Sequence, residues 1–483
     1  MCGIIGILGE ENVQYSLSIA LQTIQHRGQD SCGMGTKTGK KFYLEKDDGL
    51  VKDVFNEKKL KEFEGELGIG HVRYPTMGSG GKVNAQPFLA NQPGMFMAHN
   101  GNIINYYQLR KELLQKSLYL TSSCDIEPVL YILAEELLKI KKKNFKTKDL
   151  IKALKKTYKR VRGTYTIVGN LYLDGEETMF ACRDPHGIRP GVWGEKNGKF
   201  MVASESVALE TLGYNFKGDI PHGEVMIFKK DKKPDRYKIE VKEHTPCIFE
   251  YIYFARPDSK ISGKTPYNVR LELGRKLAKK VKKKNIDFDV VIPVPDTARP
   301  AATAIADELG IPVREGFIKN RYSARTFIMN SQKDREFAMR LKHNIIEEEF
   351  RNKNVLIIDD SIVRGTTTKY IVKLVKKAKP KKLHIGIFSP PVNHPCFYGI
   401  DISREEELIA RKFKKDYDRG LDKLENKIAE YSEADSLTYL DINDLEGVLD
   451  YDYCSACFDG KYPLPLKEEE VKSIEMDRDE THG

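Results

Sequence analysis

The first half of the chain consists of short apolar runs separated by turn residues. These runs have the length of β-strands and lie at residues 3–8, 68–72, 94–98, 164–173, 178–181 and 200–203. Apolar residues at helical spacing interrupt the runs near residues 13–25 and 126–139. Many strands interrupted by a few helices are typical of antiparallel sheets that pack against helices. We therefore expect an α+β domain over residues 1–235.

The pattern changes after a polar stretch at residues 229–235. Short apolar runs then alternate with helical patterns, which predicts a buried parallel sheet. The runs lie at residues 290–294, 355–359 and 383–388, and the helices include 299–309, 367–378 and the region 404–429. We therefore expect an α/β domain over residues 236–466, followed by a mobile acidic tail over residues 467–483.

Composition adds little to this picture. Of the 483 residues, 40% are apolar and 31% are charged, which is typical of a folded globular protein. The formal charge of +10 includes lysine clusters at residues 139–159 and 276–284. Apolar residues at helical spacing accompany both clusters, so we interpret the lysines as exposed faces of amphipathic helices. Aromatic interleaving and DNA-binding motifs are missing, so we expect no nucleic-acid partner.

Nothing in the sequence suggests a membrane or a secretory route. No apolar run approaches the ~18 residues that a membrane span requires. The first ten residues lack the basic start and the long apolar stretch of a signal peptide. We therefore expect a cytoplasmic protein with no membrane partner.

Eight cysteines are too few, in a chain of this length, for a disulfide scaffold. Cys454 and Cys457 form a CxxC pair of the kind found in redox, zinc and iron–sulfur sites. Cys247 and Cys396 can bring the set to four thiolates, which suit Zn²⁺ and a [4Fe–4S] cluster equally well on sequence grounds. Cys32, Cys124 and Cys182, unlike Cys2, are interpreted as core or loop thiols.

The most specific feature is the segment 355–368. Its apolar strand ends in Asp359 and Asp360, which can hold ribose hydroxyls directly or through Mg²⁺. A loop with Gly365 then leads into a helix, whose N-terminus offers free N–H groups and a positive dipole to a phosphate. The sequence therefore predicts a ribose-phosphate site, and it differs from the GxxxxGK[ST] loop of nucleotide triphosphatases.

Cys2 is a candidate nucleophile. Since cysteine is a small residue, we expect Met1 to be removed, so that the mature chain begins with a thiol beside its own α-amine. An α-amine has a pKa near ~8 and can act as the base for this thiol without a second side chain.

The segment 355–368 resembles the phosphoribosylpyrophosphate (PRPP) motif of the type I phosphoribosyltransferases. By this resemblance Asp359 and Asp360 serve the ribose and Mg²⁺, and the PRPP-binding set continues with Ser361, Val363, Arg364, Gly365, Thr366 and Thr367. Residues 294–299 match the pyrophosphate-binding loop of that family, with Thr297 as a ligand of Mg²⁺. The basic stretch 319–327 resembles a lid that would close over the pyrophosphate through Lys319, Arg321 and Arg325.

The first domain resembles the N-terminal-nucleophile glutamine amidotransferases, in the segments 2–6, 26–30, 70–76 and 98–102. The resemblance implies catalysis by Cys2, with the Asn100 side chain and the Gly101 N–H as the oxyanion hole. Glutamine would be bound by Arg73 at its carboxylate and by Asp125 at its ammonium group, with His71 beside them. An alternative for His71, His26 and Arg27 is a buried polar network that positions loops without touching the substrate.

Together the two halves resemble the amidophosphoribosyltransferase family, from Cys2 to about Pro465. The resemblance implies synthesis of 5-phosphoribosylamine from PRPP and glutamine, the first committed step of purine biosynthesis. It also implies Mg²⁺, an internal ammonia channel, feedback inhibition by purine nucleotides, and a homotetramer or other homo-oligomer.

The four cysteines match the iron–sulfur subclass of that family, which implies a [4Fe–4S] cluster on Cys247, Cys396, Cys454 and Cys457. Two rival interpretations of the chain are a different glutamine amidotransferase and a PRPP-sensing regulator that binds nucleic acid. The segment 355–368 disfavours the first, and the complete set of glutamine-site residues disfavours the second.

Overall fold

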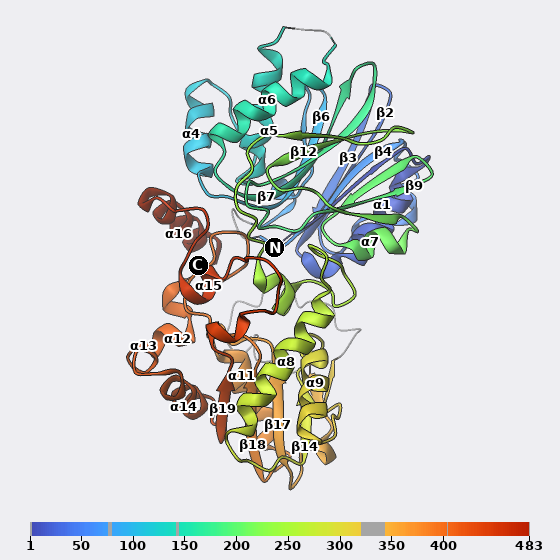
Figure 1. Ribbon diagram of the computed structural model, residues 1–483. Helices are drawn as coiled ribbons and strands as arrows, with labels where there is room; N and C mark the ends of the chain where they lie inside the picture. Colours follow the sequence, from blue (N-terminus) through green and yellow to red (C-terminus); the bar gives the residue numbers. More distant parts are fainter. Residues whose placement is uncertain (1, 76–79, 142–143, 320–342, 403, 483) are drawn as a thin grey trace.

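The computed structural model describes residues 2–75, 80–141, 144–319, 343–402 and 404–482. Two domains are stacked along the long axis of the molecule, and the N-terminal domain lies above the second in Figure 1. Within these described ranges, no helix is both long enough and apolar enough to cross a membrane.

Two antiparallel sheets form the N-terminal domain, with the strand orders β11-β9-β10-β1-β4-β2-β3 and β13-β12-β8-β7-β6-β5. The strands of the first sheet are β1 (Gly3–Leu8), β2 (Ser31–Thr38), β3 (Lys41–Asp48), β4 (Leu67–Arg73), β9 (Val192–Lys196), β10 (Lys199–Ala203) and β11 (Asn215–Asp219). Those of the second are β5 (Phe88–Ala90), β6 (Met95–Ile103), β7 (Gly163–Leu173), β8 (Glu176–Arg183), β12 (Glu224–Lys229) and β13 (Asp235–Lys238).

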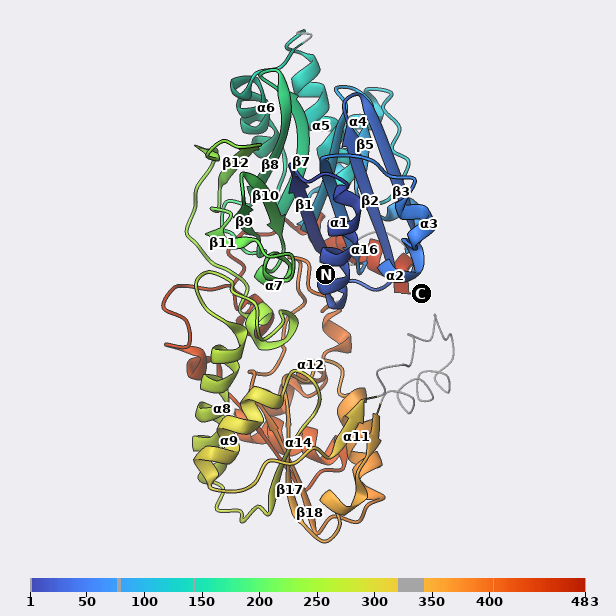
Figure 2. The same cartoon turned by 90° about the vertical axis from the view of Figure 1, so that its right-hand side faces the viewer.

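Helices cover the outer faces of both sheets, so the domain has four layers, α-β-β-α (Figure 2). Strand β1 shows why: Ile4 belongs to the core between the sheets, whereas Ile5 and Ile7 belong to the core beneath α1. Because successive strand side chains point to opposite faces, a strand that is apolar throughout has to be covered on both sides. The covering helices are α1 (Val13–Thr23) and α7 (Ser206–Thr211) on the first sheet, and α4 (Tyr106–Gln115), α5 (Ile126–Leu138) and α6 (Thr147–Arg160) on the second.

The second domain contains the predicted parallel sheet, in the order β14-β17-β18-β19. Its strands are β14 (Val290–Pro293), β17 (Asn354–Asp359), β18 (Lys382–Ile387) and β19 (Ser436–Tyr439). In β17, Leu356 and Ile358 pack in the core under α8 and α9, while Val355 and Ile357 face α11 and α14. These helices are α8 (Pro266–Lys282), α9 (Arg299–Leu309), α11 (Thr366–Lys376) and α14 (Leu421–Ser432).

Two boundaries differ from the sequence-based expectation. The polar stretch 229–235 is the turn between β12 and β13, so the first domain continues to Lys238, past the expected limit at residue 235. Turn and linker share the same residue types, so composition alone cannot separate them.

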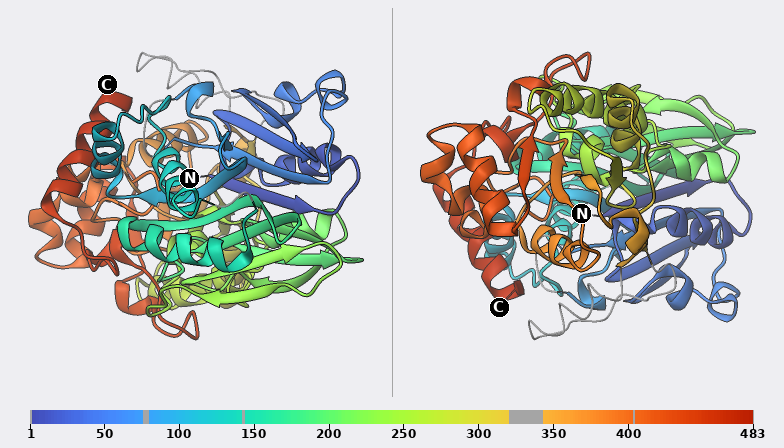
Figure 3. Two further views of the ribbon diagram at one scale, coloured as in Figure 1. Left: turned by 90° about the horizontal axis from the view of Figure 1, so that it is seen from above. Right: turned by 90° about the horizontal axis from the view of Figure 1, so that it is seen from below.

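The segment expected to be a mobile tail is the helix α16 (Glu468–His482), which lies beside α4 (Figures 1 and 3). Its Ile474 is fully buried, and Glu470 pairs with Arg162 of the first domain at 2.8 Å. Because few apolar residues anchor the helix, its sequence shows only a weak amphipathic pattern.

Candidate active sites

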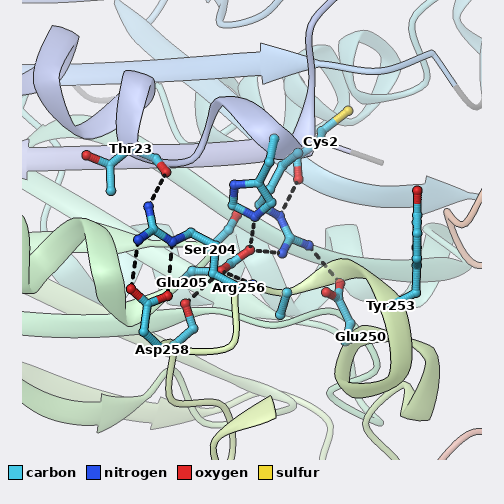
Figure 4. A network of polar contacts seen from close by, with 12 residues as sticks. Cys2, Thr23, Ser204, Glu205, Glu250, Tyr253, Arg256 and Asp258 are labelled. Atoms are coloured by element: carbon cyan, nitrogen blue, oxygen red, sulfur yellow. Dashed lines mark hydrogen bonds and ion pairs between the residues drawn. The ribbon is translucent and has the colours of Figure 1, made fainter. Parts of the chain in front are cut away.

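The nucleophile candidate lies directly before β1, in the middle of the first sheet. Cys2 is buried, and its Sγ lies 3.6 Å from the carbonyl oxygen of Tyr74. Arg27 donates from Nε to the carbonyl oxygen of Cys2 at 3.0 Å. In Figure 4 the sulfur points away from the charged side chains behind it. The thiol therefore lies beside the Tyr74 carbonyl group, while the Cys2 backbone is held by Arg27.

The two residues expected to form the oxyanion hole lie on β6. Asn100 is buried, and neither polar atom of its side chain has a partner among the described residues. A buried, unpaired amide costs about 1–3 kcal/mol, so an orphaned Asn at this position is suited to receive a ligand. Gly101 lies so close to β7 that an added Cβ would approach the Thr164 carbonyl oxygen to 1.9 Å, which explains the glycine.

Asp125, the candidate partner of the glutamine ammonium group, is held at the start of α5. Its Oδ2 accepts the N–H of Ile103 at 2.8 Å and lies 3.2 Å from Nε2 of His99. Burial favours the neutral acid, but His99, the Ile103 N–H and Arg73 together lower the pKa of Asp125. The carboxylate is therefore ionised at neutral pH, as a cation-binding group requires.

Arg73 ends β4 and is buried at the same site. Its backbone is packed so tightly against Gly28 that a Cβ there would lie 2.5 Å from the Arg73 carbonyl carbon. This contact gives a physical reason for the glycine in the segment 26–30 and fixes the strand end that carries the guanidinium.

Sequence reasoning missed two residues that position Asp125. His99 lies between Asp125 and Gln86, whose Oε1 accepts the His99 N–H at 2.8 Å and whose Nε2 lies 3.1 Å from Nδ1. His99 belongs to the matched segment 98–102, so a signal was present, whereas nothing in the sequence singled out Gln86.

His71 is fully buried, and neither ring nitrogen has a partner among the described residues. Burial, together with His99 and Arg73, lowers the pKa of His71 well below its usual value. The ring is therefore neutral near Arg73, so a charged contact with glutamine is disfavoured.

The second site lies at the carboxyl ends of β14 and β17. Asp359 ends β17, and burial followed by the neighbouring Asp360 raises its pKa well above the usual value. Burial likewise raises the pKa of Asp360 to about 6, against the opposing effects of Ser361, which donates to it at 2.6 Å, and of Arg270. Asp360 is buried and Asp359 is half-buried, and two adjacent carboxylates that repel each other are suited to a ligand carrying hydroxyls or a divalent cation.

The loop after Asp360 leads into α11, as predicted. Gly365 caps the helix with a φ of 76°, and an added Cβ would approach Ile409 to 2.3 Å. Thr366 and Thr367 form the first turn, whose N–H groups have no acceptor within the helix and can therefore bind an anion. Arg364 pairs with Glu407 at 2.7 Å, an interaction that the sequence did not indicate.

Thr297 lies in the loop between β14 and α9, at the same edge of the sheet as Asp359. The preceding Asp296 pairs with Lys319 at 3.0 Å, which places the first cation of the expected lid beside this loop. Val363 is fixed by its carbonyl oxygen, which accepts the Ile409 N–H at 2.9 Å. Arg321 and Arg325 lie outside the described residues.

Comparison with known proteins addresses both sites together. A family model described as a glutamine amidotransferase domain matches residues 76–211, and one described as a phosphoribosyl transferase domain matches residues 268–393. The amidophosphoribosyltransferase of Pseudomonas aeruginosa is 43% identical over 96% of this chain and 93% of its own length. That of Methanocaldococcus jannaschii is 39% identical over 98% and 99% of the two chains. This chain belongs to the amidophosphoribosyltransferase family.

Solved structures agree with this assignment. A glutamine PRPP amidotransferase from B. subtilis, complexed with ADP and GMP, is 34% identical with a TM-score of 0.84, covering 97% of this chain and 98% of its own. A structure described as the allosteric regulatory enzyme of purine biosynthesis is also 34% identical, with a TM-score of 0.85 and 99% coverage of both chains. The shared fold therefore includes both domains.

The four candidate cluster cysteines come together from three segments. Cys247 and Cys454 form a parallel backbone bridge, and the Cys457 carbonyl oxygen accepts the N–H of His394, two residues before Cys396. Burial, followed by the other three thiols, raises the pKa of Cys457 well above its usual value. In the described part of the chain, no three His, Cys, Asp or Glu side chains are arranged to hold a single metal ion.

Proposed function

We propose that this protein is a glutamine-dependent amidophosphoribosyltransferase, which converts PRPP, glutamine and water to 5-phosphoribosylamine, glutamate and pyrophosphate. This is the first committed step of purine biosynthesis. The observation that carries the proposal is that one chain holds two sets of groups. One is the buried Cys2 thiol and a buried Asn100 side chain that has no partner among the described residues, and the other is a carboxylate pair ahead of an anion-binding helix start.

In the first reaction, the Cys2 Sγ attacks the side-chain amide carbon of glutamine. The α-amine of Cys2, free once Met1 is removed, takes the thiol proton and passes it to the leaving ammonia. The Asn100 side chain and the Gly101 N–H stabilise the oxyanion. Water then cleaves the glutamyl thioester, releasing glutamate. Arg73 and ionised Asp125 bind the carboxylate and ammonium ends of glutamine.

In the second reaction, ammonia attacks C1 of PRPP and pyrophosphate leaves. Asp359 and Asp360 hold the ribose hydroxyls, and the first turn of α11 holds the 5-phosphate together with Arg364. The developing charge on pyrophosphate is neutralised by cations that include Lys319 and Arg321.

Mg²⁺ fits this second site because Asp359 and Asp360 are two adjacent carboxylates beside the Thr297 loop. Mg²⁺ is usually held by one or two carboxylates plus substrate phosphates, so a dedicated three-residue cage is not needed. When bound, the ion supplies charge neutralisation to the pyrophosphate leaving group.

A [4Fe–4S] cluster on Cys247, Cys396, Cys454 and Cys457 places this chain in the iron–sulfur subclass. The donor set fits, because the thiols are buried together and Cys396 Sγ accepts the Tyr398 N–H at 3.4 Å.

Regulation and assembly follow the family. We infer a cytoplasmic homo-oligomer, such as a homotetramer, that purine nucleotides inhibit. The support is the B. subtilis relative, whose solved structure contains ADP and GMP.

The test is the variant Cys2→Ala. It should lose more than about a thousandfold of the glutamine-dependent rate, because the nucleophile is gone. It should keep PRPP amination by free ammonia, because the second site is intact. Intact mass should show that wild-type enzyme begins at Cys2. Retained glutamine-dependent activity in Cys2→Ala would refute the N-terminal assignment.

A further inference from the structure

A buried ionic network connects the two domains behind Cys2 (Figure 4). Arg27 and Glu205 belong to the first domain, and Glu250 begins the short π-helical turn η3 (Glu250–Phe254) that leads into the second. Arg27 pairs with both carboxylates, and its Nη2 lies 2.7 Å from Glu250 Oε1. Arg189 pairs with the same Glu250 oxygen. All four side chains are at most 1% exposed.

Arg27 is held in three directions. Nη1 donates to Glu205, Nη2 donates to Glu250, and Nε donates to the Cys2 carbonyl oxygen. Although burial lowers the pKa of Arg27, Glu250 and Glu205 raise it above its usual value, so the guanidinium remains charged. The position of the Cys2 backbone therefore depends on where the two carboxylates stand.

Arg189 connects the same carboxylate to the opposite wall of the glutaminase site. Its Nη1 donates to the Tyr398 carbonyl oxygen at 3.1 Å, and that oxygen also accepts Thr164 Oγ1 at 3.0 Å. Thr164 pairs with Asn102 on β6, two residues from Asn100.

The residue after Tyr398, Gly399, leaves so little room that a Cβ there would lie 3.3 Å from the Gly101 carbonyl carbon. The segment that Arg189 holds is therefore packed directly on the oxyanion strand.

Glu250 is itself fixed from the second domain. Arg270 of α8 is buried and donates to the carbonyl oxygens of Tyr251, Tyr253 and Ala255, which follow Glu250. Arg270 thus holds the backbone of the turn in place. The second carboxylate oxygen of Glu250, Oε2, has no partner among the described residues.

We propose that Glu250 is a positioning residue of the glutaminase reaction. Its carboxylate sets the distance between the nucleophile, through Arg27, and the oxyanion strand, through Arg189 and Tyr398. This inference rests on the proposed function. It gives Glu250, a residue of the segment that connects the two domains, a part in the glutaminase reaction of the first domain.

The test compares Glu250→Gln with Glu425→Gln. Glu425 is a similarly buried carboxylate that pairs with Lys284 at 2.8 Å and accepts the Tyr439 N–H, but contacts neither arginine. A misplacement of about 1 Å can cost roughly a hundredfold in rate. Glu250→Gln should therefore lower the glutaminase kcat by about that factor, leave the KM for glutamine within about threefold, and keep ammonia-dependent synthesis within about twofold.

Iodoacetamide alkylation of Cys2, followed by mass spectrometry, supplies a readout independent of turnover and should be slowed in Glu250→Gln but not in Glu425→Gln. The double variant Glu250→Gln/Arg189→Met keeps the buried charges balanced and should show the same loss of kcat. The proposal is overturned if the double variant regains wild-type glutaminase activity, if ammonia-dependent activity falls in parallel, or if both single variants lose the same amount. A wild-type enzyme without glutaminase activity would instead refute the proposed function.

Discussion

At the scale of single residues, the two sites use burial in opposite ways. Asp125 is buried yet remains ionised, because His99, the Ile103 N–H and Arg73 surround it. Asp360 is buried beside a half-buried Asp359, and loss of solvation raises the pKa of both carboxyls. Asp125 is therefore ionised and can bind an ammonium group. The repulsion between Asp359 and Asp360, by contrast, is reduced when a ligand binds to them.

Asp360 gives this difference a pH signature. In the folded chain its pKa is about 6, against 3.8 as its usual value, so the folded state binds the proton more tightly. Stability should therefore fall as the pH rises from about 4 to 6, by about 3 kcal/mol, since one pKa unit corresponds to about 1.36 kcal/mol. Asp360→Asn should reduce this fall and raise the stability at pH 7, measured by urea unfolding in a chelating buffer.

The exposed Asp307→Asn on α9 is the matched control and should leave the pH profile unchanged. An Asp360→Asn profile that overlays the wild-type profile would contradict the burial argument.

At the scale of elements, regular patterns were predictable and their long-range partners were not. Three strands of the parallel sheet, β14, β17 and β18, and the start of α11 follow from short apolar runs and from Gly365, whereas the edge strand β19 was not predicted. The hairpin between β12 and β13 resembled a linker because turn and linker use the same residues. Helix α16 resembled a free tail because its order depends on Ile474 and Glu470, which meet partners distant in the chain.

In the proposed iron–sulfur assignment, a cluster on the four cysteines would fix the C-terminal segment to the second domain. Purified under anaerobic conditions, the protein should contain about four iron atoms per chain and a broad absorbance near 400 nm. Cys457→Ser should lose the iron and destabilise the region around the CxxC, as followed by limited proteolysis. Cys182→Ser, at a buried thiol in β8, is the control and should retain it. Stoichiometric zinc without iron would exclude the cluster.

At the scale of the whole molecule, the sequence indicated both chemistries but not how the domains join. Cys2, Asn100 and Asp359 were recognisable because each lies in a short motif. Glu250 and Arg189 carry no such signal, since a buried ion pair between distant segments has no local pattern. Under the proposed function, ammonia released in the N-terminal domain is used in the second domain, so the two reactions should be stoichiometric.

The most direct test of the proposed function follows glutamate and pyrophosphate together in wild-type enzyme supplied with glutamine, PRPP and Mg²⁺. The two products should form at equal rates, and no pyrophosphate should form when both glutamine and ammonia are left out. Glutamate release without pyrophosphate, or pyrophosphate release that does not depend on a nitrogen donor, would contradict it.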